Sequence, residues 1–587
     1  MFKWRDLLFL SLLFLCLIQL TSAQHDHATM GMDEPVPAFN ATGDELMSYA
    51  LFPEKKGYFY IHVAMMVIAF WVLMPIGIML GIAKSSFHVP VQLLAFCFAM
   101  AGFFFAQLYG HSTPHLYKGN SHHTLGWILF LFMLIQMSVG VVRKIANAVG
   151  RRSSNAYERL QEVQQREFIR SGTSSSSSDH QSEASGDTLH MNEFDLDKQE
   201  YRRSSNPEIN NANHSTDYED DPEGAEENDQ LVSSLNDNRS KVVFEKEPVT
   251  MRLFNLASPY IPSIVKDGFV MLAYNPFTKV VCRYFHMIMG RTFIVLIFVQ
   301  TLSGLVVYHG VCRSWEVLGC IAHLIKGGIF FFYGMGTFGR YLGAFANRGW
   351  AWNKVEGASG FSFEMVECSL IFVYGITNTW MEHFGQDSAW THKDLEHASL
   401  AFMWWWCGLV GILVESRAVR RLLERTILTN TNNTTVDREG YSWNPFPALT
   451  VLMTGISMGN HHQDTAYSSN IHYMWGLLLA TAALCRFITY ITLYRNPPKD
   501  SQPTRPPSEL VGAFLLTAGS ILFMASNSGT LLWLRRNNVD SMFLMNVCVA
   551  FTSITLTYVA TLMVIKAWSE KREWNKRQAR QSTIESF

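Results

Sequence analysis

Residues 122–140, HHTLGWILFLFMLIQMSVG, and residues 286–304, HMIMGRTFIVLIFVQTLSG, decide the fold of this chain. Each stretch is a histidine followed by glycine four positions later, glutamine fourteen later and glycine eighteen later. The two sets are His122, Gly126, Gln136 and Gly140, and His286, Gly290, Gln300 and Gly304. On an α-helix these offsets share one stripe about 27 Å long, close to the roughly 30 Å hydrocarbon core of a bilayer.

The template predicts membrane helices whose buried stripe carries an imidazole at one end and a glycine at the other. An imidazole can ligate a metal or a haem iron, and a glycine makes room where a bulky group or another helix must come close. A weaker pair supports the pattern, because His62-Val63 and His88-Val89 each precede an Ala-Phe dipeptide at the same distance. Four apolar segments therefore each carry one histidine near their start.

Composition places the whole chain in the membrane class. It has 587 residues, of which 48% are hydrophobic, and a formal net charge of −2, so nucleic acid is not an implied partner. Long apolar runs predict an all-α polytopic membrane helix bundle, with a four-helix histidine-bearing core and about seven further transmembrane helices. The predicted helices are 59–82, 87–108, 122–144, 284–308, 315–338, 362–384, 395–416, 446–460, 470–493, 508–534 and 541–567.

The remaining segments have distinct compositions. Residues 1–23 are typical of a signal peptide, and residues 24–57 are expected to form a lumenal or extracellular tail. The core comprises 58–145 and 280–310, interrupted at 146–270 by a serine-rich, acidic stretch predicted to be a disordered cytosolic insert. A seven-helix membrane domain, 311–570, and a basic cytosolic tail, 571–587, complete the chain. Cys312 and Cys320 flank a predicted lumenal turn and are able to bridge, although the sequence favours the unbridged state.

Basic residues set the expected orientation. They are more frequent in the predicted cytosolic segments, with examples at Arg340, Arg417, Arg495 and Arg572, than in the predicted lumenal loops. The positive-inside rule therefore favours a lumenal or extracellular N-terminus and a cytosolic C-terminus. We expect an integral protein of the secretory pathway, in the plasma membrane, the vacuole or another endomembrane. Glu364 and Glu367, near the start of a predicted helix, are expected at the membrane interface.

The alternating helix directions group the four histidines by depth. His62 and His122 are expected near the lumenal surface, and His88 and His286 near the cytosolic surface. Two imidazoles at equal depth are what bis-histidine ligation of a haem requires, so the pattern predicts two haems b, with Gly140 and Gly304 making room for them. Each histidine taken alone is more often structural, and His123 is an immediate rival to His122.

A family resemblance rests on four strings of this sequence. They are His62-Val63-Ala64 followed by Met74-Pro75-Ile76-Gly77, Phe87-His88 with Gln92, His122 with Gly126, and His286 with Gly290-Arg291. These strings resemble the ascorbate-reducible two-haem cytochrome b family over about 60–145 and 280–310. The resemblance implies a four-helix core, two haems b and electron transfer across the membrane. The long insert and the absence of evident flanking helices depart from that family.

The whole architecture resembles a fungal family of multi-pass membrane proteins, the Ytp-like proteins. That family pairs a histidine-bearing N-terminal region of this kind with a longer helical C-terminal region. The resemblance implies the architecture of the chain rather than an activity.

A second concentration of possible ligands lies at predicted lumenal helix ends. The candidate metal ligands are Glu382, His383, His392, Asp394, His397, His461, His462 and His472, with Glu396 beside them. Imidazoles and carboxylates suit a Zn, Cu or Fe ion, while the structural alternative is a solvated polar loop. This part also resembles a vertebrate transmembrane family of unknown function that carries a similar run of glutamate, histidine and aspartate.

Two functions compete on this sequence. The favoured one is transmembrane electron transfer, from a small cytosolic reductant such as ascorbate to a lumenal ferric or cupric ion, which would make the protein a transmembrane metalloreductase. The expected partners are then membrane lipid, the reductant and a metal ion, and the sequence leaves the oligomeric state open. The alternative is a haem-free membrane transporter or metal-handling protein, with the histidines and acids lining a path.

Overall fold

The computed structural model describes residues 48–117, 119–140, 275–313, 317–355, 361–381, 389–427 and 443–585. All regular structure in these ranges is helical, which confirms the predicted all-α class. The described residues form two compact units, one up to Leu129 and from Phe293 onward, the other between Phe130 and Thr292. The predicted signal segment and the whole of the predicted insert lie outside the described residues.

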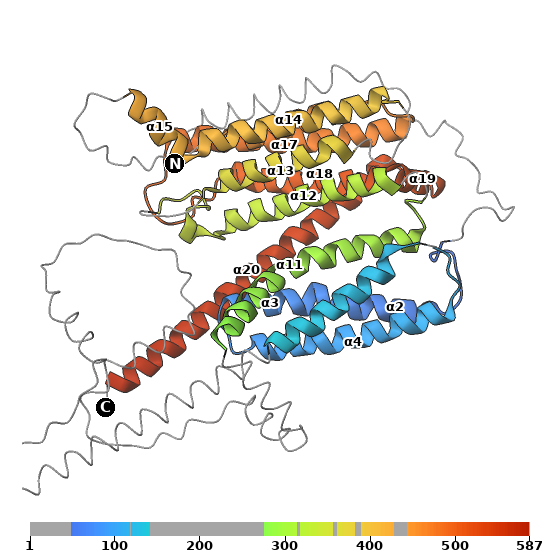
Figure 1. Ribbon diagram of the computed structural model, residues 1–587, viewed down its shortest axis with the longest axis horizontal. Coiled ribbons are helices and arrows are strands. Elements are labelled where there is room, and N and C mark those ends of the chain that lie inside the picture. The colour runs from blue at the N-terminus through green and yellow to red at the C-terminus, as the bar shows by residue number, and fades with distance from the viewer. Residues whose placement is uncertain are drawn as a thin grey trace, which may run out of the picture. The chain divides into compact units, whose positions relative to one another are not determined.

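Four helical segments carry one of the four histidines each; α2, α3, α4 and α11 are labelled in Figure 1. The first is a continuous run of α2 (Lys56–Met66), the π-helix η1 (Val67–Leu73) and α3 (Met74–Ile82). Pro75 lacks an N–H and its ring would clash with the carbonyl of Trp71, so the wider π segment lies where a proline disturbs a regular helix. α4 (His88–Ser112), the helix Ser121–Gly140 and α11 (Pro276–His309) follow.

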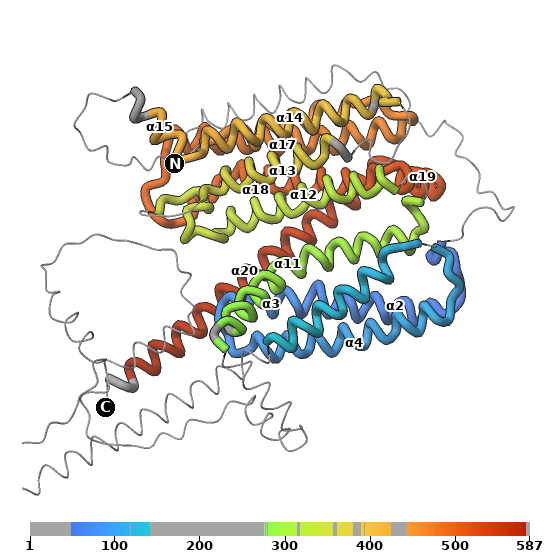
Figure 2. Tube along the Cα trace, in the orientation of Figure 1, coloured from blue at the N-terminus to red at the C-terminus, as the bar shows by residue number. Residues whose placement is uncertain are grey.

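The rest of the chain forms a C-terminal bundle, traced from green to red in Figure 2. Its helices are α12 (Val317–Leu342), α13 (Phe363–Met381), α14 (His392–Glu415), α15 (Arg417–Ile427), α16 (Phe446–Gly459), α17 (Ala466–Arg495), α18 (Pro507–Ala525), α19 (Ser528–Arg536) and α20 (Ser541–Glu585). A short 3-10 turn, η4 (Ala346–Arg348), follows α12. Nine of the described helices are long and apolar enough to cross a membrane, whereas α13 does not meet that test and α16 is shorter.

Two predicted helices differ markedly from the structure, and one helix was not predicted. The predicted helix 508–534 is broken, because the Asn527 side chain accepts a hydrogen bond from the Thr530 N–H and so caps a separate helix, α19. The predicted basic tail is helical through Glu585, since no proline or glycine interrupts α20. α15 was not predicted; its arginines and the exposed Leu422 and Leu423 make it amphipathic, as in helices that lie at a membrane surface.

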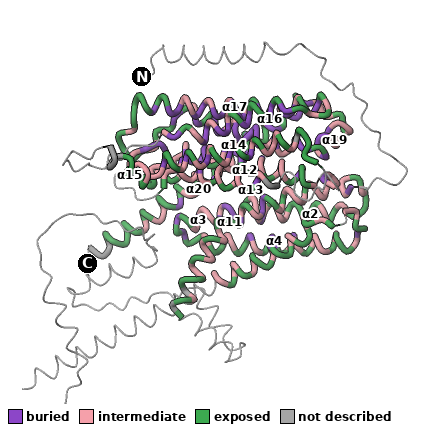
Figure 3. The backbone as a smooth tube through the Cα atoms, turned by 45° about the horizontal axis from the view of Figure 1, so that its top comes forward, coloured by how far each residue is buried: buried purple, intermediate pink, exposed green. Residues whose placement is uncertain are grey.

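Glycines allow the helices of the C-terminal bundle to approach closely. A Cβ added to Gly476 of α17 would lie 2.4 Å from the Gly455 carbonyl oxygen of α16. A Cβ on Gly375 of α13 would lie 2.2 Å from the Trp405 nitrogen of α14, and one on Gly334 of α12 would meet Thr517 of α18. Close packing of this kind holds membrane helices together, since lipid supplies little hydrophobic driving force between them. Buried residues accordingly concentrate on α16 and α17 (Figure 3).

One end of the N-terminal helices is joined to the segment after α11. Phe59 stacks on Tyr308 with ring centroids 4.6 Å apart. The Tyr117 hydroxyl lies 2.7 Å from the Cys312 carbonyl oxygen, and Cys312 is disulfide-bonded to Cys320. The bridge that the sequence left less favoured is therefore present.

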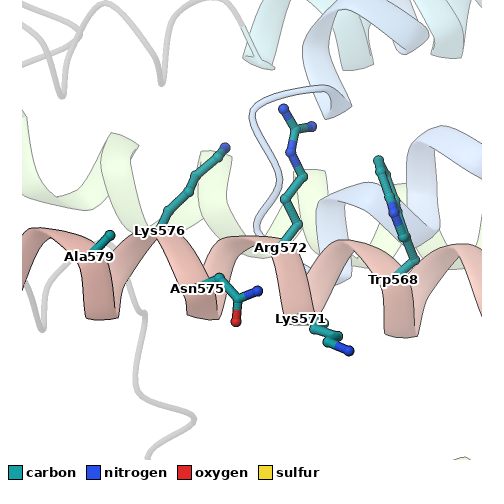
Figure 4. A pocket seen from close by; sticks show the side chains of 6 residues that line it. All are labelled: Trp568, Lys571, Arg572, Asn575, Lys576 and Ala579. Carbon is teal, nitrogen blue, oxygen red and sulfur yellow. The ribbon is translucent and has the colours of Figure 1, made fainter.

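The last helix also contacts the N-terminal part of the same unit. α20 packs against α3, α12 and α18, and the Arg572 guanidinium lies 4.4 Å from the centre of the Phe87 ring. Figure 4 shows Arg572 and Trp568 near Lys571 and Lys576, around a surface pocket at this end of α20. A basic and aromatic helix end of this kind is typical of the boundary between membrane and cytosol.

Candidate histidine sites and a buried ionic cluster

The two copies of the template face each other. In the first unit, the His122 ring lies against Gly304, where an added Cβ would come within 2.9 Å of the ring carbon Cε1. The Gln300 amide donates to the His122 carbonyl oxygen at 2.9 Å, and its nitrogen lies beside Gly126. Each end of one copy therefore meets the opposite end of the other, as in an antiparallel helix pair.

The second unit repeats these contacts with the roles exchanged. The His286 ring lies beside Gly140, 3.7 Å from the position of an added Cβ. The Gln136 amide donates to the His286 carbonyl oxygen at 3.0 Å, and its nitrogen lies beside Gly290. The template is therefore self-complementary. Its terminal glycines make room for the histidine ring of the other copy, and the expectation that they also make room for haem stays a prediction.

Three of the four rings have a defined proton position. The Nδ1 atom of His62 lies 2.9 Å from the Gly102 carbonyl oxygen, and that of His88 lies 2.7 Å from the Gly77 carbonyl oxygen. A carbonyl only accepts, so Nδ1 carries the proton in both rings. His122 Nδ1 is 3.0 Å from Ser303 Oγ, whose own proton goes to the Gln300 carbonyl. Each of these three rings therefore has its lone pair on Nε2, the form that binds a metal.

His286 differs from the other three. Its Nδ1 lies 2.9 Å from the Gln136 amide nitrogen. That amide donates, so the ring accepts at Nδ1 and carries its proton on Nε2. This is not the tautomer in which Nε2 ligates iron.

The two predicted haem-ligand pairs differ in how the compact units divide them. His62 and His122 lie in one unit. His88 belongs to this unit and His286 to the other, so the pairing of those two stays a prediction. The side chains around His62 and His122 fit axial ligands of a haem, since each ring is oriented through Nδ1 by its own hydrogen-bond acceptor.

The predicted metal ligands of the second half are only partly brought together. Glu396 contacts His392 at 3.2 Å and also contacts His461, and the His397 and His461 rings have centroids 5.0 Å apart. Asp394 instead caps the start of α14 with Thr391. His472 is buried, with Nδ1 2.8 Å from the Ser468 carbonyl oxygen, whereas His462 is exposed.

Glu382 and His383 lie outside the described residues. Within the described ranges, no group of three or more histidine, cysteine, aspartate or glutamate side chains is arranged to hold a metal ion. The metal site therefore stays a prediction.

Sequence reasoning missed a buried ionic cluster at one end of the C-terminal bundle. Its members are Arg340 of α12, Glu364 and Glu367 of α13, Arg486 of α17 and Glu509 of α18, and none is more than 9% exposed. Glu364 and Glu367 are thus buried inside the protein, and their position at the membrane interface stays a prediction. The available signal was Arg486, an arginine inside a long apolar run, because an intramembrane charge requires a partner.

The cluster is held by short charge–charge contacts. Arg486 Nε lies 2.5 Å from Glu509 Oε1, and Arg486 Nη1 lies 3.3 Å from Glu367 Oε1. Arg340 lies 3.8 Å from Glu367 and 3.7 Å from Glu364. The guanidinium of Arg340 also lies between two aromatic rings, those of Trp352 at 4.1 Å and Phe363 at 3.8 Å.

Comparisons with known proteins cover both halves of the chain. The family model "Protein YTP1-like, C-terminal" matches residues 296–567, and the model of a domain of unknown function, DUF2427, matches residues 45–146. The second match contains His62, His88 and His122, and ends at the first residue of the predicted insert. No solved structure matches the chain.

Three relatives align with the chain. An uncharacterized membrane protein of Schizosaccharomyces pombe, C3B8.06, is 34% identical over 91% of this chain and 99% of its own length. An uncharacterized membrane protein of Saccharomyces cerevisiae, YCR061W, is 27% identical over 86% of this chain and 82% of its own length. Protein YTP1 of the same yeast is 25% identical over 40% of this chain and 44% of its own length.

Proposed function

The chain belongs to the YTP1-like family of membrane proteins, and on that premise we propose that its N-terminal helices carry electrons across the membrane through haem b. His62 and His122 are the axial ligands of one haem, and His88 and His286 those of a second. The acceptor on the lumenal side is a ferric or cupric ion, and the donor is a small cytosolic reductant of the ascorbate type. The predicted N-terminal orientation is part of this proposal.

The tautomer of His62 and His122 is the observation that carries the proposal. Each ring gives its Nδ1 proton to an acceptor supplied by the chain, the Gly102 carbonyl or the Ser303 hydroxyl. Such outer contacts fix the ring and raise its basicity as a ligand.

Haem b, when bound, supplies one-electron transfer between its ferric and ferrous states. The chain's own residues hold and orient the ligands. Gly304 admits the His122 ring, and Gln300 holds the backbone of His122 from the facing helix. His286 joins this scheme only if its ring takes the other tautomer, which requires the Gln136 side chain to reorient.

The disulfide supports the proposed orientation. Disulfides persist in oxidising compartments and are rare in the cytosol. The Cys312–Cys320 bridge follows α11, and Tyr117 of the segment before His122 contacts the Cys312 carbonyl. In the proposed orientation both segments lie on the lumenal or extracellular side, with His122 near them, where a disulfide is expected to persist.

The test uses the purified full-length protein. We expect a reduced-minus-oxidised difference spectrum of a b-type haem, and the loss of one haem component in His62→Ala and in His122→Ala. In proteoliposomes loaded with ascorbate, the wild-type protein should reduce external ferricyanide, which does not cross the membrane, and both variants should lose this activity.

The exposed neighbour His123 provides the matched control. His123→Ala should keep the spectrum and the ferricyanide reduction, and size-exclusion profiles should show that all variants remain folded. A colourless wild-type protein produced in haem-supplemented cells would exclude the proposal. So would an unchanged haem content in both His62→Ala and His122→Ala.

A further inference from the structure

From the buried ionic cluster we propose a second site, a proton-binding site in the C-terminal bundle centred on Glu364. The bound proton converts the Glu364 carboxylate to the neutral acid, and it is taken from a hydronium ion that becomes water. The site uses none of the histidines assigned to electron transfer, so the two proposals can be tested independently.

The buried ionic cluster contains more acidic than basic groups. The cluster holds two guanidinium groups, which stay charged in proteins, and three carboxyl groups. With all five ionised it would carry one negative charge inside the bundle. Because an uncompensated buried charge is strongly unfavourable, a buried acid without a full partner takes up a proton instead.

Distances identify Glu364 as the acid that takes the proton. Glu509 has the closest contact, 2.5 Å to Arg486, and Glu367 lies between both arginines at 3.3 and 3.8 Å. Glu364 reaches a single arginine, Arg340, at 3.7 Å, and shares it with Glu367. The least compensated carboxyl is therefore Glu364.

Charged and titratable groups on three helices act on Glu364. They are Arg340 of α12, Glu367 and Cys368 of α13, and Arg486 and Tyr490 of α17. Glu415 of α14 is engaged elsewhere, 2.5 Å from the Ser362 hydroxyl and 3.8 Å from Arg420. No further cation within the described residues contacts Glu364. Its charge is compensated by Arg340, the more distant Arg486 and its own backbone N–H in the first turn of α13.

Unpartnered polar atoms give independent support. Glu367 is 6% exposed and Tyr490 is 6% exposed, yet Glu367 Oε2 and the Tyr490 hydroxyl oxygen have no hydrogen-bond partner among the described residues. A cavity of about 20 Å³ reaches two members of the cluster, Arg486 and Glu509, and is also lined by Tyr333 and Thr337. That volume admits about one water molecule. Together these features give a proton a place to enter the cluster.

Trp352 closes the cluster from the connecting segments. Its ring covers Arg340, and its carbonyl accepts from the Thr504 hydroxyl at 2.9 Å. Its backbone has φ +52°, which is unfavourable for a bulky residue. The nearby Asn353 side chain ties the two segments together through the Ser501 carbonyl at 2.7 Å. Displacing this tryptophan would open the site to the cytosol in the proposed orientation.

Infrared spectroscopy of the full-length protein tests the site. At neutral pH the wild type should show the C=O stretching band of a protonated carboxyl, and raising the pH should remove it. Glu364→Gln should lack the band, whereas Glu54→Gln, an exposed control, should retain it.

Thermal unfolding gives a second readout. The folded chain holds this proton where the unfolded chain has released it, so wild-type stability should fall as the pH rises, and Glu364→Gln should lose this dependence. Glu364→Gln should also melt at or above the wild-type temperature at neutral pH, because glutamine mimics the neutral acid. Glu367→Gln should melt lower, because it weakens the pairing of both arginines.

Several results would overturn the proposal. They are a wild-type protein without the band, a band that persists in Glu364→Gln, or a band lost only in Glu367→Gln or Glu509→Gln. A Glu364→Gln protein that fails to fold while Glu367→Gln folds would also overturn it, since Glu364 would then act as a paired anion. Loss of haem in His62→Ala should leave the band unchanged, which separates this site from the electron-transfer proposal.

Discussion

The helices of the C-terminal bundle are buried by other protein segments to a greater extent than the histidine-bearing helices are. Within their apolar windows, α17 and α18 are 50% and 61% buried, whereas the α2–α3 run and α4 are 28% and 17% buried. The first pair is enclosed by protein on most sides. The second presents large side chains such as Leu93 and Phe104 outward, where lipid can cover them.

The difference follows the chemistry that each region contains. Charged groups are tolerated only where protein surrounds them with partners, and the five charged residues lie in the dense bundle. Neutral imidazoles need one acceptor each, so they can lie on lightly packed helices. Loose packing there also leaves freedom for a large flat group, which the dense bundle would exclude.

Removing a charge from the dense region should have the largest effect. Arg486→Ala leaves Glu367 and Glu509 without their shared guanidinium, and we expect it to cost about 3–5 kcal/mol of stability. A thiol-reactive dye can follow unfolding in detergent, because Cys368, Cys485 and Cys548 are buried. Arg495→Ala, an exposed position on the same helix, should melt like the wild type. Equal melting of both variants would contradict the distinction between the regions.

A glycine in the same bundle tests its packing. Gly476→Ala places a methyl group 2.4 Å from the Gly455 carbonyl oxygen, so the backbones of α16 and α17 must separate. Overpacking of this kind costs about 1–3 kcal/mol. At Gly319 an added Cβ would meet no described atom within 4 Å; Gly319→Ala is therefore the control, and should leave the melting temperature unchanged. The same unfolding assay measures both.

The smallest effect is expected at the template. Gly304→Ala places a methyl group 2.9 Å from a His122 ring carbon, and a ring can move where a backbone cannot. Melting should change less than in Gly476→Ala, while haem content should fall because the ring is displaced. Gly110→Ala, which meets no described atom within 4 Å, should keep both values. A larger loss of stability in Gly304→Ala than in Gly476→Ala would show that the histidine-bearing helices are packed more tightly than the C-terminal bundle, contrary to the expectation.

The repeat in the sequence was sufficient to predict the two helices that contain it and the helix face on which His122 and His286 lie. Its spacing gave the stripe of His122, Gly126, Gln136 and Gly140, and this stripe does lie at a helix contact. Periodicity identifies a face and does not identify its neighbour. The same pattern therefore suited a haem beside Gly304 as well as the imidazole that lies there. The cap at Asn527 was also readable, since asparagine before serine is a helix start signal.

The ionic cluster could not be predicted in the same way. Arg340 and Arg486 are far apart in sequence, and only the folded chain brings Glu364 and Glu509 to the same end of the bundle. A carboxylate near a helix start is readily explained by local structure, because the helix dipole stabilises a negative charge there. It is equally explained as a residue at the membrane interface. The sequence alone gives no reason to prefer burial for Glu364 and Glu367.

The length of α20 has a mechanical consequence. At 45 residues it extends about 68 Å, more than twice the thickness of a bilayer's hydrocarbon core. It contacts α12 and α18 along its course, and its Arg572 rests on Phe87, the residue before His88. A partner that binds the end of α20 and moves this helix would therefore also move Phe87 and the adjacent His88, a proposed haem ligand. A fusion or truncation near the C-terminus is for this reason not a neutral modification.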